Sequence, residues 1–411
     1  MKSVEKIKAY LLTEHTKQEI GQMVVVQNKI YFKYHEDFLE TALEISPFRL
    51  KRTSEIVTPT ENHFEGLFGV FHDSLPDGWG RLLLDRKLKS LQVDLNSLTA
   101  LDRLSFLDNN SMGAIAYEPV YETNVFNSHQ IDLDKIASEI NMVLSGDASD
   151  VVDELFQLGG SSGGARPKIL VGYKKNTNEL LFGKDILPDG FEHWIIKFPS
   201  SHDREDIALI EYTYNQMAER AGIEVASYKL FKSAKGNIFF GSKRFDRRGN
   251  TKIHLHSAAG LLHDNFRMST LDYGHLMDAA FKLEKDVKAY SKIFRMAAFN
   301  VLAHNRDDHS KNFSFLMDAK GVWSVAPAYD LTFSTSSFGM HSTAVFGELK
   351  SPGREHLLQL ASHFKVKNPT LLIDEVQSAI NQFEILAHQN MISKDSTQLI
   401  KSQLSRVNSH L

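Results

Sequence analysis

The nine residues from His304 to Asn312 read HNRDDHSKN, and Asp330 follows in the sequence APAYD. Four residues separate Asp307 from Asn312, as in the catalytic loop of protein kinases. Phosphoryl transfer needs a carboxylate that orients and deprotonates the attacking hydroxyl, and oxygen ligands for the magnesium that neutralises the phosphates. The stretch therefore predicts a kinase centre that uses ATP and Mg²⁺, with Asp307 as the base and Asn312 and Asp330 as magnesium ligands.

Two adjacent aspartates compete for the role of base. Only three residues separate Asp308 from Asn312, so we expect Asp308 to be a loop or surface carboxylate. The same stretch also suits a plain polar turn between two apolar segments. His304 and His309 lack the spacing of a zinc protease, and we expect them to support the loop through hydrogen bonds.

Composition narrows the class of protein. The chain has 411 residues, of which 42% are hydrophobic, so it can bury substantial cores. Its formal net charge is -4, which argues against binding DNA without a partner. It has no cysteine, and no segment is apolar enough for a membrane span. We expect a soluble, cytoplasmic protein without disulfides.

The order of patterns along the chain predicts the fold class. We expect an N-terminal subdomain over 1–120, the rest of a strand-rich lobe over 121–250, and a helical lobe over 251–411. This is an α+β, two-lobed protein-kinase-like fold. The expected strands are 21–26 and 29–34, joined as a hairpin, then 113–117, 169–173, 179–182, 192–199, 227–231 and 237–240; the expected helices are 81–91, 131–158, 205–221 and most of the chain after 254.

Lys197 is the candidate cation for the nucleotide phosphates, because it lies in a strand after a Gly-rich segment. Glu211, on the following helix, is its candidate partner, since a strand lysine paired with a helix glutamate is a kinase arrangement. A surface lysine on an edge strand remains an alternative, and Pro199 is compatible with it. Helical carboxylates are usually solvated, which makes Glu211 the weaker candidate of the pair.

The Gly-rich segment, residues 159–168, suits backbone contact with phosphates, because glycine permits close approach. Arg166 and Lys168 add positive charge, and Ser161 and Ser162 are candidate phosphorylation sites. The alternative is a flexible hairpin or linker. Lys243 and Phe245 follow a strand where a kinase hinge would contact adenine. Phe245 suits a core equally well, with its charged neighbours on a solvated face.

Taken together, the motifs resemble the HipA family of bacterial toxin kinases. The matches, in chain order, are GVFHDSLPDGWGRLLLDR at 69–86, SSGGARPK at 161–168, HWIIKFP at 193–199, KRFDR at 243–247, NRDDHSKN at 305–312 and APAYD at 326–330. The resemblance implies a protein serine/threonine kinase toxin that is paired with a HipB-like helix-turn-helix antitoxin and contacts DNA only through it. It also implies a translation component, such as an aminoacyl-tRNA synthetase, as substrate.

Carried over by position, the resemblance implies the same roles for Asp307, Asn312, Asp330 and Lys197, and a hinge at Lys243 and Phe245. Ser161 matches the serine whose autophosphorylation ejects the loop and switches the kinase off. Two positions depart from the family: Ser162 replaces an apolar residue or proline, and Lys243 replaces a glutamate. Two other functions stay open, namely a small-molecule kinase and a non-catalytic corepressor that caps a DNA-bound antitoxin.

Overall fold

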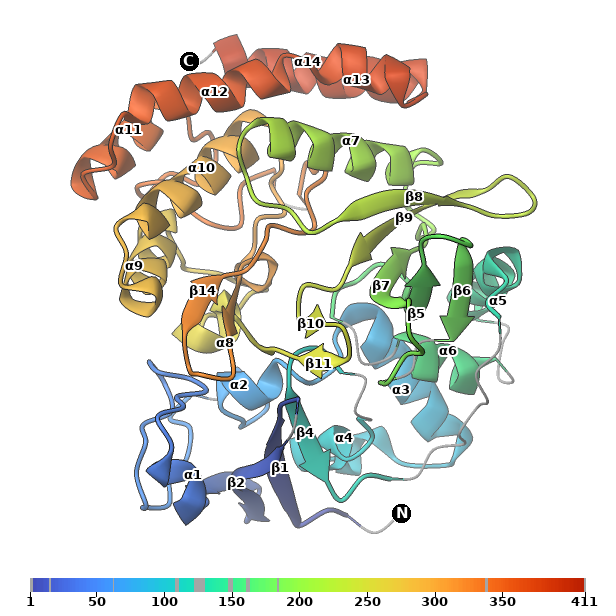
Figure 1. Ribbon diagram of the computed structural model, residues 1–411, viewed down its shortest axis with the longest axis vertical. Helices are drawn as coiled ribbons and strands as arrows, with labels where there is room; N and C mark the ends of the chain where they lie inside the picture. The colour runs from blue at the N-terminus through green and yellow to red at the C-terminus, as the bar shows by residue number, and fades with distance from the viewer. Residues whose placement is uncertain are drawn as a thin grey trace. The chain divides into compact units, whose positions relative to one another are not determined.

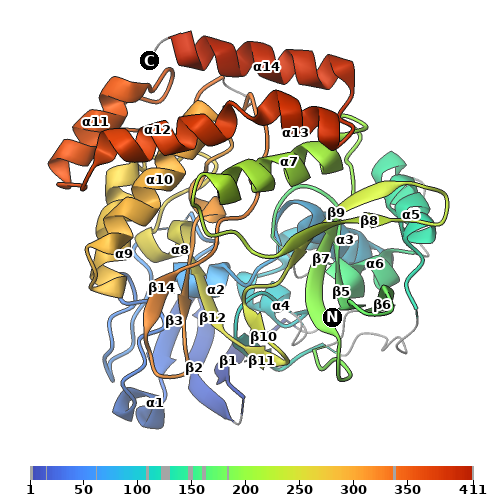
Figure 2. The ribbon, with the colours of Figure 1, turned by 45° about the horizontal axis from the view of Figure 1, so that its top comes forward.

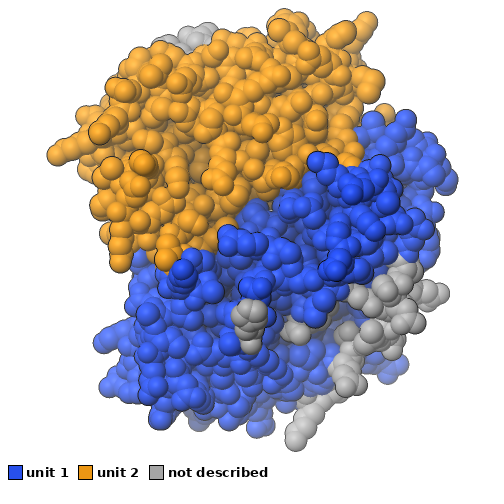
Figure 3. All heavy atoms as spheres, viewed as in Figure 1, with its two compact units in different colours: residues 1–203, 231–256, 317–321 blue, residues 204–230, 257–316, 322–411 orange. Residues whose placement is uncertain are grey.

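The structure is a computed structural model that describes residues 3–14, 16–61, 63–107, 111–121, 130–146, 151–159, 163–182, 185–336 and 339–409. The chain divides into two compact units, coloured in Figure 3. Unit 1 comprises residues 1–203, 231–256 and 317–321, and unit 2 comprises residues 204–230, 257–316 and 322–411. The units therefore interleave along the sequence.

Unit 1 begins with an antiparallel sheet whose strand order is β3-β2-β1-β4. Its strands are β1 (Lys6–Leu12), β2 (Lys17–Val26), β3 (Lys29–Tyr34) and β4 (Ile115–Glu118). The predicted hairpin is confirmed: Val26 pairs with Lys29, and Gln27 and Asn28 turn with φ angles of 49° and 60°. Two positive φ angles define the tight turn whose twist matches that of the flanking strands.

Helices cover the N-terminal part of unit 1. They are α1 (Glu36–Glu40), α2 (Gly69–His72), α3 (Gly78–Ser90), the 3-10 turn η1 (Leu95–Ser97) and α4 (Ala100–Leu104). The predicted helix 81–91 is α3, which begins earlier, at Gly78. Its apolar face, including Trp79, Leu83 and Leu84, is buried in the core that continues into the second sheet.

The second sheet has the order β6-β5-β7-β9-β8 (Figure 1). Its strands are β5 (Lys168–Lys174), β6 (Glu179–Phe182), β7 (Glu192–Lys197), β8 (Tyr228–Lys232) and β9 (Ile238–Lys243). The helical pattern predicted over 131–158 forms two helices, α5 (Leu133–Ser145) and α6 (Val152–Gly159), because Gly146, at φ 95°, ends the first. Short strands follow: β10 (Arg247–Arg248), β11 (Thr251–Lys252) and β12 (His254–Ser257).

Unit 2 is mostly helical. Its elements are α7 (Ile207–Arg220), α8 (Ala258–Leu262), α9 (Tyr273–Glu284), α10 (Lys288–Leu302), η2 (Ser310–Asn312), β13 (Ser314–Met317), β14 (Trp323–Val325), α11 (Arg354–His363), α12 (Pro369–Ile380), α13 (Phe383–Gln389) and α14 (Lys394–Ser409). In Figures 1 and 2, α7 lies beside α12 and α13. The region after 254 is mostly helical, as predicted, and it also contains the short strands β12, β13 and β14.

The helices of unit 2 fix the place where the catalytic loop begins. The Tyr214 hydroxyl, fully buried on α7, donates to the carbonyl of Ala303 at 2.8 Å, one residue beyond the end of α10. Burial raises the pKa of Tyr214 well above its ordinary value, so the hydroxyl stays protonated as a donor. No helix of the described residues is long and apolar enough to cross a membrane.

Candidate active site

Asp307 lies on the loop that joins α10 to η2, and its side chain is 58% exposed. The Asn312 amide nitrogen Nδ2 donates to the backbone carbonyl of Asp307 at 2.7 Å. This bond closes the loop. It uses only Nδ2 of Asn312, and the amide oxygen Oδ1 is the atom that could bind a metal. The spacing that predicted a catalytic loop thus produces a direct contact between its two ends.

Asp308 lies on the loop, as one of the two alternatives expected, but it is not a surface carboxylate, because the residue is only 1% exposed. Its carboxylate accepts hydrogen bonds from the Tyr273 hydroxyl at 2.8 Å and from the backbone N–H of Ser342 at 2.8 Å. His341 Nδ1 lies 3.0 Å away, and the Thr343 hydroxyl donates to the Asp308 carbonyl at 2.5 Å. The two aspartates therefore differ: Asp308 anchors the loop through buried hydrogen bonds, while the side chain of Asp307 is exposed to solvent.

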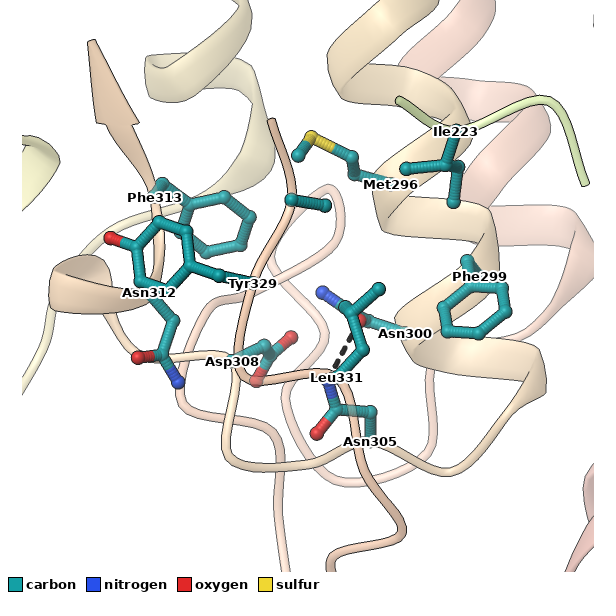
Figure 4. Close-up of a pocket in the computed structure, with 11 residues that line it drawn as sticks. Ile223, Met296, Phe299, Asn300, Asn305, Asp308, Asn312, Phe313, Tyr329 and Leu331 are labelled. Carbon is teal, nitrogen blue, oxygen red and sulfur yellow. Dashed lines mark hydrogen bonds between the residues drawn. The ribbon is translucent and has the colours of Figure 1, made fainter. Parts of the chain in front are cut away.

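The anchor continues into α10 through a chain of buried amides. Asn300 Nδ2 donates to the Tyr273 hydroxyl at 2.8 Å, and Asn305 Nδ2 donates to Asn300 Oδ1 at 2.9 Å. Figure 4 shows Asn300, Asn305 and Asp308 among the residues that line a small pocket, which Asn312 and Tyr329 also line. A connected buried network of this kind holds a loop in one conformation, because any broken link leaves a polar group unsatisfied.

Asp330 is half-buried and has a φ angle of 54°, a conformation uncommon outside glycine. The preceding residue ties it to the catalytic loop: the Tyr329 hydroxyl donates to the carbonyl of Lys311 at 2.6 Å. The backbone N–H of Ala328 donates to the carbonyl of Glu224 at 2.8 Å, which fixes the same segment to the residues that follow α7. Unit 2 thus holds Asp307, Asn312 and the backbone of Asp330 in one framework.

The two histidines of the loop differ. His304 is 4% exposed, its Nδ1 lies 3.2 Å from the carbonyl of Ser334, and burial lowers its pKa to about 4. It supports the loop as predicted. His309 Nε2 lies 3.9 Å from Asp307 Oδ1 and makes no close hydrogen bond to it. The described residues include no cluster of three or more His, Cys, Asp or Glu side chains able to hold a metal ion.

In unit 1 the Gly-rich segment is described at Gly159 and from Gly163 onward, and Ser161 and Ser162 lie outside the described residues. Residues near the start of α3 hold it: Gly164 N–H donates to the Asp77 carboxylate, and Trp79 N–H donates to the Gly164 carbonyl at 3.1 Å. Gly78 is required there, because a Cβ would lie 2.5 Å from the Gly164 carbonyl oxygen. The sequence identified 75–80 only as a turn, so this role was missed.

Lys168 and Lys197 are directly opposite each other on β5 and β7. Directly opposed residues of antiparallel strands share one face of the sheet, and like charges in that position are destabilising. The Lys168 ammonium donates to the Gly163 carbonyl, at the Gly-rich segment, and Lys197 Nζ lies 5.6 Å from the centre of the Phe240 ring. Lys168 and Lys197 thus bring two positive charges to one face of the sheet.

Two other predicted site residues are an ion-paired arginine and a buried glutamate. Arg166 forms an ion pair with Asp203 at 3.2 Å. Glu211 is 2% exposed on α7, which argues against the alternative of a solvated helical carboxylate. Lys197 belongs to unit 1 and Glu211 to unit 2, and their pairing stays a prediction.

The KRFDR segment carries a buried ionic network. Lys243 pairs with Glu192, and Phe245 is half-buried in the turn after β9. Arg244 and Arg247 both donate to the Asp246 carboxylate, at 2.7 and 2.8 Å, and all three are at most 5% exposed. The solvated face considered for these charges was wrong. Although burial raises the pKa of Asp246, the two arginines lower it well below its usual range.

Two family models match the chain. The HipA-like C-terminal domain model matches residues 160–384, more than half of the chain, and the HipA N-terminal domain model matches residues 14–118. A curated relative, the serine/threonine-protein kinase toxin HipA of Shewanella oneidensis, is 26% identical over 289 residues. That match spans 62% of this chain and 60% of the relative's length.

Solved structures show the same fold. A chain of the Shewanella oneidensis MR-1 complex of HipA, HipB and operator DNA has a TM-score of 0.68 and 19% identity, over 98% of this chain and 95% of that chain. The Helicobacter pylori proinflammatory kinase CtkA reaches a TM-score of only 0.41 with 14% identity, which supports no argument about the fold. The predicted α+β, kinase-like fold is confirmed. From its two matched domain models, the chain belongs to the HipA family.

Proposed function

We propose that this chain is an ATP-dependent serine/threonine protein kinase. One observation carries the proposal: an exposed Asp307 carboxylate lies on a loop closed by Asn312 and anchored from beneath by the buried Asp308. A base that must reach a substrate hydroxyl needs solvent access and a rigid support at once. The adjacent aspartates supply these two properties separately.

The residues around Asp307 have oxygen donors of the type that magnesium prefers. Asn312 Oδ1 and the Asp330 carboxylate would hold Mg²⁺, which supplies charge neutralisation at the ATP phosphates. Asn312 is well suited, since its Nδ2 is used by the Asp307 carbonyl and its amide is thereby oriented. Asp307 then accepts the proton of the attacking serine hydroxyl.

In unit 1, Lys168 and Lys197 would bind the ATP phosphates, with Arg166 as an additional cation once released from Asp203. Two lysines on one face of the sheet would supply positive charge for the negatively charged phosphates. Lys243 and Phe245 would form the adenine hinge, where a backbone contact is enough because the Lys243 ammonium is used by Glu192.

The biological setting follows from family membership. We propose that the chain is the toxin of a toxin–antitoxin pair, that a HipB-like helix-turn-helix protein is its partner, and that DNA is contacted only through this partner. A translation component such as an aminoacyl-tRNA synthetase is the proposed substrate. The curated relative is named a kinase toxin, and the solved relative is complexed with HipB and operator DNA, which supports this setting.

Autophosphorylation of Ser161 or Ser162 is the proposed off-switch. A phosphate adds a charge of about -1.5 to -2 at neutral pH. It would repel the ATP phosphates from a segment whose neighbours, Lys168 and Arg166, serve to attract them.

The test is transfer of labelled phosphate from Mg-ATP, comparing wild type with Asp307→Asn and mapping the label by mass spectrometry. We expect wild type to label itself at Ser161 or Ser162 and Asp307→Asn to transfer nothing while still binding ATP, because only the base is lost. An active Asp307→Asn would refute the assignment of the base. Phosphorylated metabolites without labelled protein would favour a small-molecule kinase, and ATP binding without any transfer would favour the non-catalytic corepressor.

A further inference from the structure

Arg306, the residue immediately before the proposed base, has an incompletely used guanidinium group. Its Nη1 donates to the carbonyl of Gly339 at 2.6 Å, while its Nε is buried and has no hydrogen-bond partner. Among the residues that the structure describes, no carboxylate lies within ion-pair distance of it. Burial lowers the pKa of Arg306, and the nearby negative charge of Asp308 offsets this only in part. A guanidinium has five N–H donors in a planar fork, and within the described residues only Nη1 of Arg306 makes a hydrogen bond.

The segment after Asp330 brings hydroxyl groups to this arginine. Arg306 N–H donates to the Ser334 carbonyl at 3.3 Å, and Ser334 N–H donates to the His304 carbonyl at 3.1 Å, so that Asn305 and Ser334 form a parallel bridge. Successive residues of paired extended strands alternate between faces. The next residues, Arg306 and Thr335, therefore occupy neighbouring positions on one face of this pairing.

Thr335 is the most accessible hydroxyl at this place. It is exposed, and its side chain makes no hydrogen bond within the described structure. The hydroxyl of Ser336 is committed instead: it donates to the Met340 carbonyl at 2.6 Å and accepts from the Met340 N–H at 3.1 Å. Ser336 also has a φ of 52° and turns the chain back toward Gly339, whose carbonyl contacts Arg306.

We propose that Thr335 is a phosphorylation site and that Arg306 is the receptor for its phosphate. The inference rests on the proposed kinase function for the phosphate donor. In the transfer step, Thr335 Oγ1 forms a bond to the γ-phosphorus of ATP, the bond from that phosphorus to ADP breaks, and the hydroxyl proton passes to Asp307 of a second copy of the chain. A charge-assisted, bidentate arginine–phosphate pair then joins the Thr335 loop to the residue beside the base.

The receptor can be tested without relying on kinase activity. The full chain carrying Asp307→Asn is produced with phosphoserine in place of Thr335, which is incorporated during translation by codon suppression. The phosphate is then titrated by ³¹P NMR. Its second pKa, ordinarily about 6, should be lower by about 0.5 unit or more than in the same chain carrying Arg306→Gln, because the guanidinium favours the dianion. Arg354→Gln, which removes an arginine of α11 that is paired with Asp374, is the matched control and should leave the lowered value in place. Equal pKa values in the chains with and without Arg306→Gln would overturn the proposal.

The modification is tested separately. Wild-type protein incubated with Mg-ATP should contain a Thr335 phosphopeptide that is absent from Asp307→Asn and Thr335→Val. If the chain phosphorylates itself or a substrate but never Thr335, the modification is refuted. If it transfers phosphate to nothing, the proposed kinase function fails, while the titration still decides whether Arg306 is a phosphate receptor.

Discussion

Asp308→Ala should destabilise the protein far more than the same change at the adjacent Asp307. The substitution leaves the Tyr273 hydroxyl, the Ser342 N–H and His341 without their shared acceptor in a site that is 1% exposed. A buried donor left unsatisfied costs about 1–3 kcal/mol. Water entering the new space and the non-additivity of such losses reduce the total, so we expect a loss of about 3–5 kcal/mol in the free energy of unfolding.

The measurement is equilibrium unfolding in urea, followed by circular dichroism, with thermal melting as a second probe. A loss of that size should lower the melting temperature by roughly 6–20 °C for a unit of about 150–250 residues. Asp307→Ala is the matched control, because its side chain is 58% exposed and surface changes usually fall within about 0.5 kcal/mol. Asp308→Asn should lie between the two, since one amide oxygen still accepts a bond. Equal stability of Asp308→Ala and Asp307→Ala would refute the anchoring role.

Three further outcomes follow from the site and its surroundings. Asp330→Ala should weaken magnesium-dependent nucleotide binding by about 10-fold or more and lower turnover as well, as measured by calorimetry with and without Mg²⁺; unchanged affinity would exclude Asp330 as a ligand. Asp77→Ala should speed hydrogen exchange at Gly164, because the carboxylate that accepts this N–H is removed; unchanged exchange would show that the bond does not hold the loop. The pKa of His254 is lowered from 6.5 to about 4 by burial and by His256. The folded state therefore keeps His254 neutral while the unfolded state protonates, so the free energy of unfolding should fall as pH drops from 6.5 toward 4. His254→Gln should make that fall shallower, and an unchanged pH dependence would contradict the assignment.

Local patterns were sufficient for much of the fold. The Gln27-Asn28 turn between two alternating strands specified a hairpin, because asparagine tolerates positive φ, and the structure has the hairpin with its turn at these residues. The periodicity of 205–221 likewise produced α7, at Ile207–Arg220. At β12 and β13 the pattern could not distinguish a strand from a helix segment, since each is only four residues long.

The candidate site divides in the same way. Spacing alone favoured Asp307 over Asp308 as the predicted base, because the number of residues before Asn312 is a property of one short segment. The amino-acid sequence by itself thus determined the family, the reaction class to propose and the principal acidic residues.

Only the tertiary structure decided which charges are buried and what holds them. The carboxylate of Asp308 accepts hydrogen bonds from Tyr273 on α9 and from Ser342 on a later loop. The carboxylate of Asp77 accepts one from Gly164, about 90 positions away in sequence, and that of Asp246 accepts hydrogen bonds from two buried arginines. A charged residue carries no local mark of burial, because whether it is solvated depends on partners that the fold brings together from distant segments.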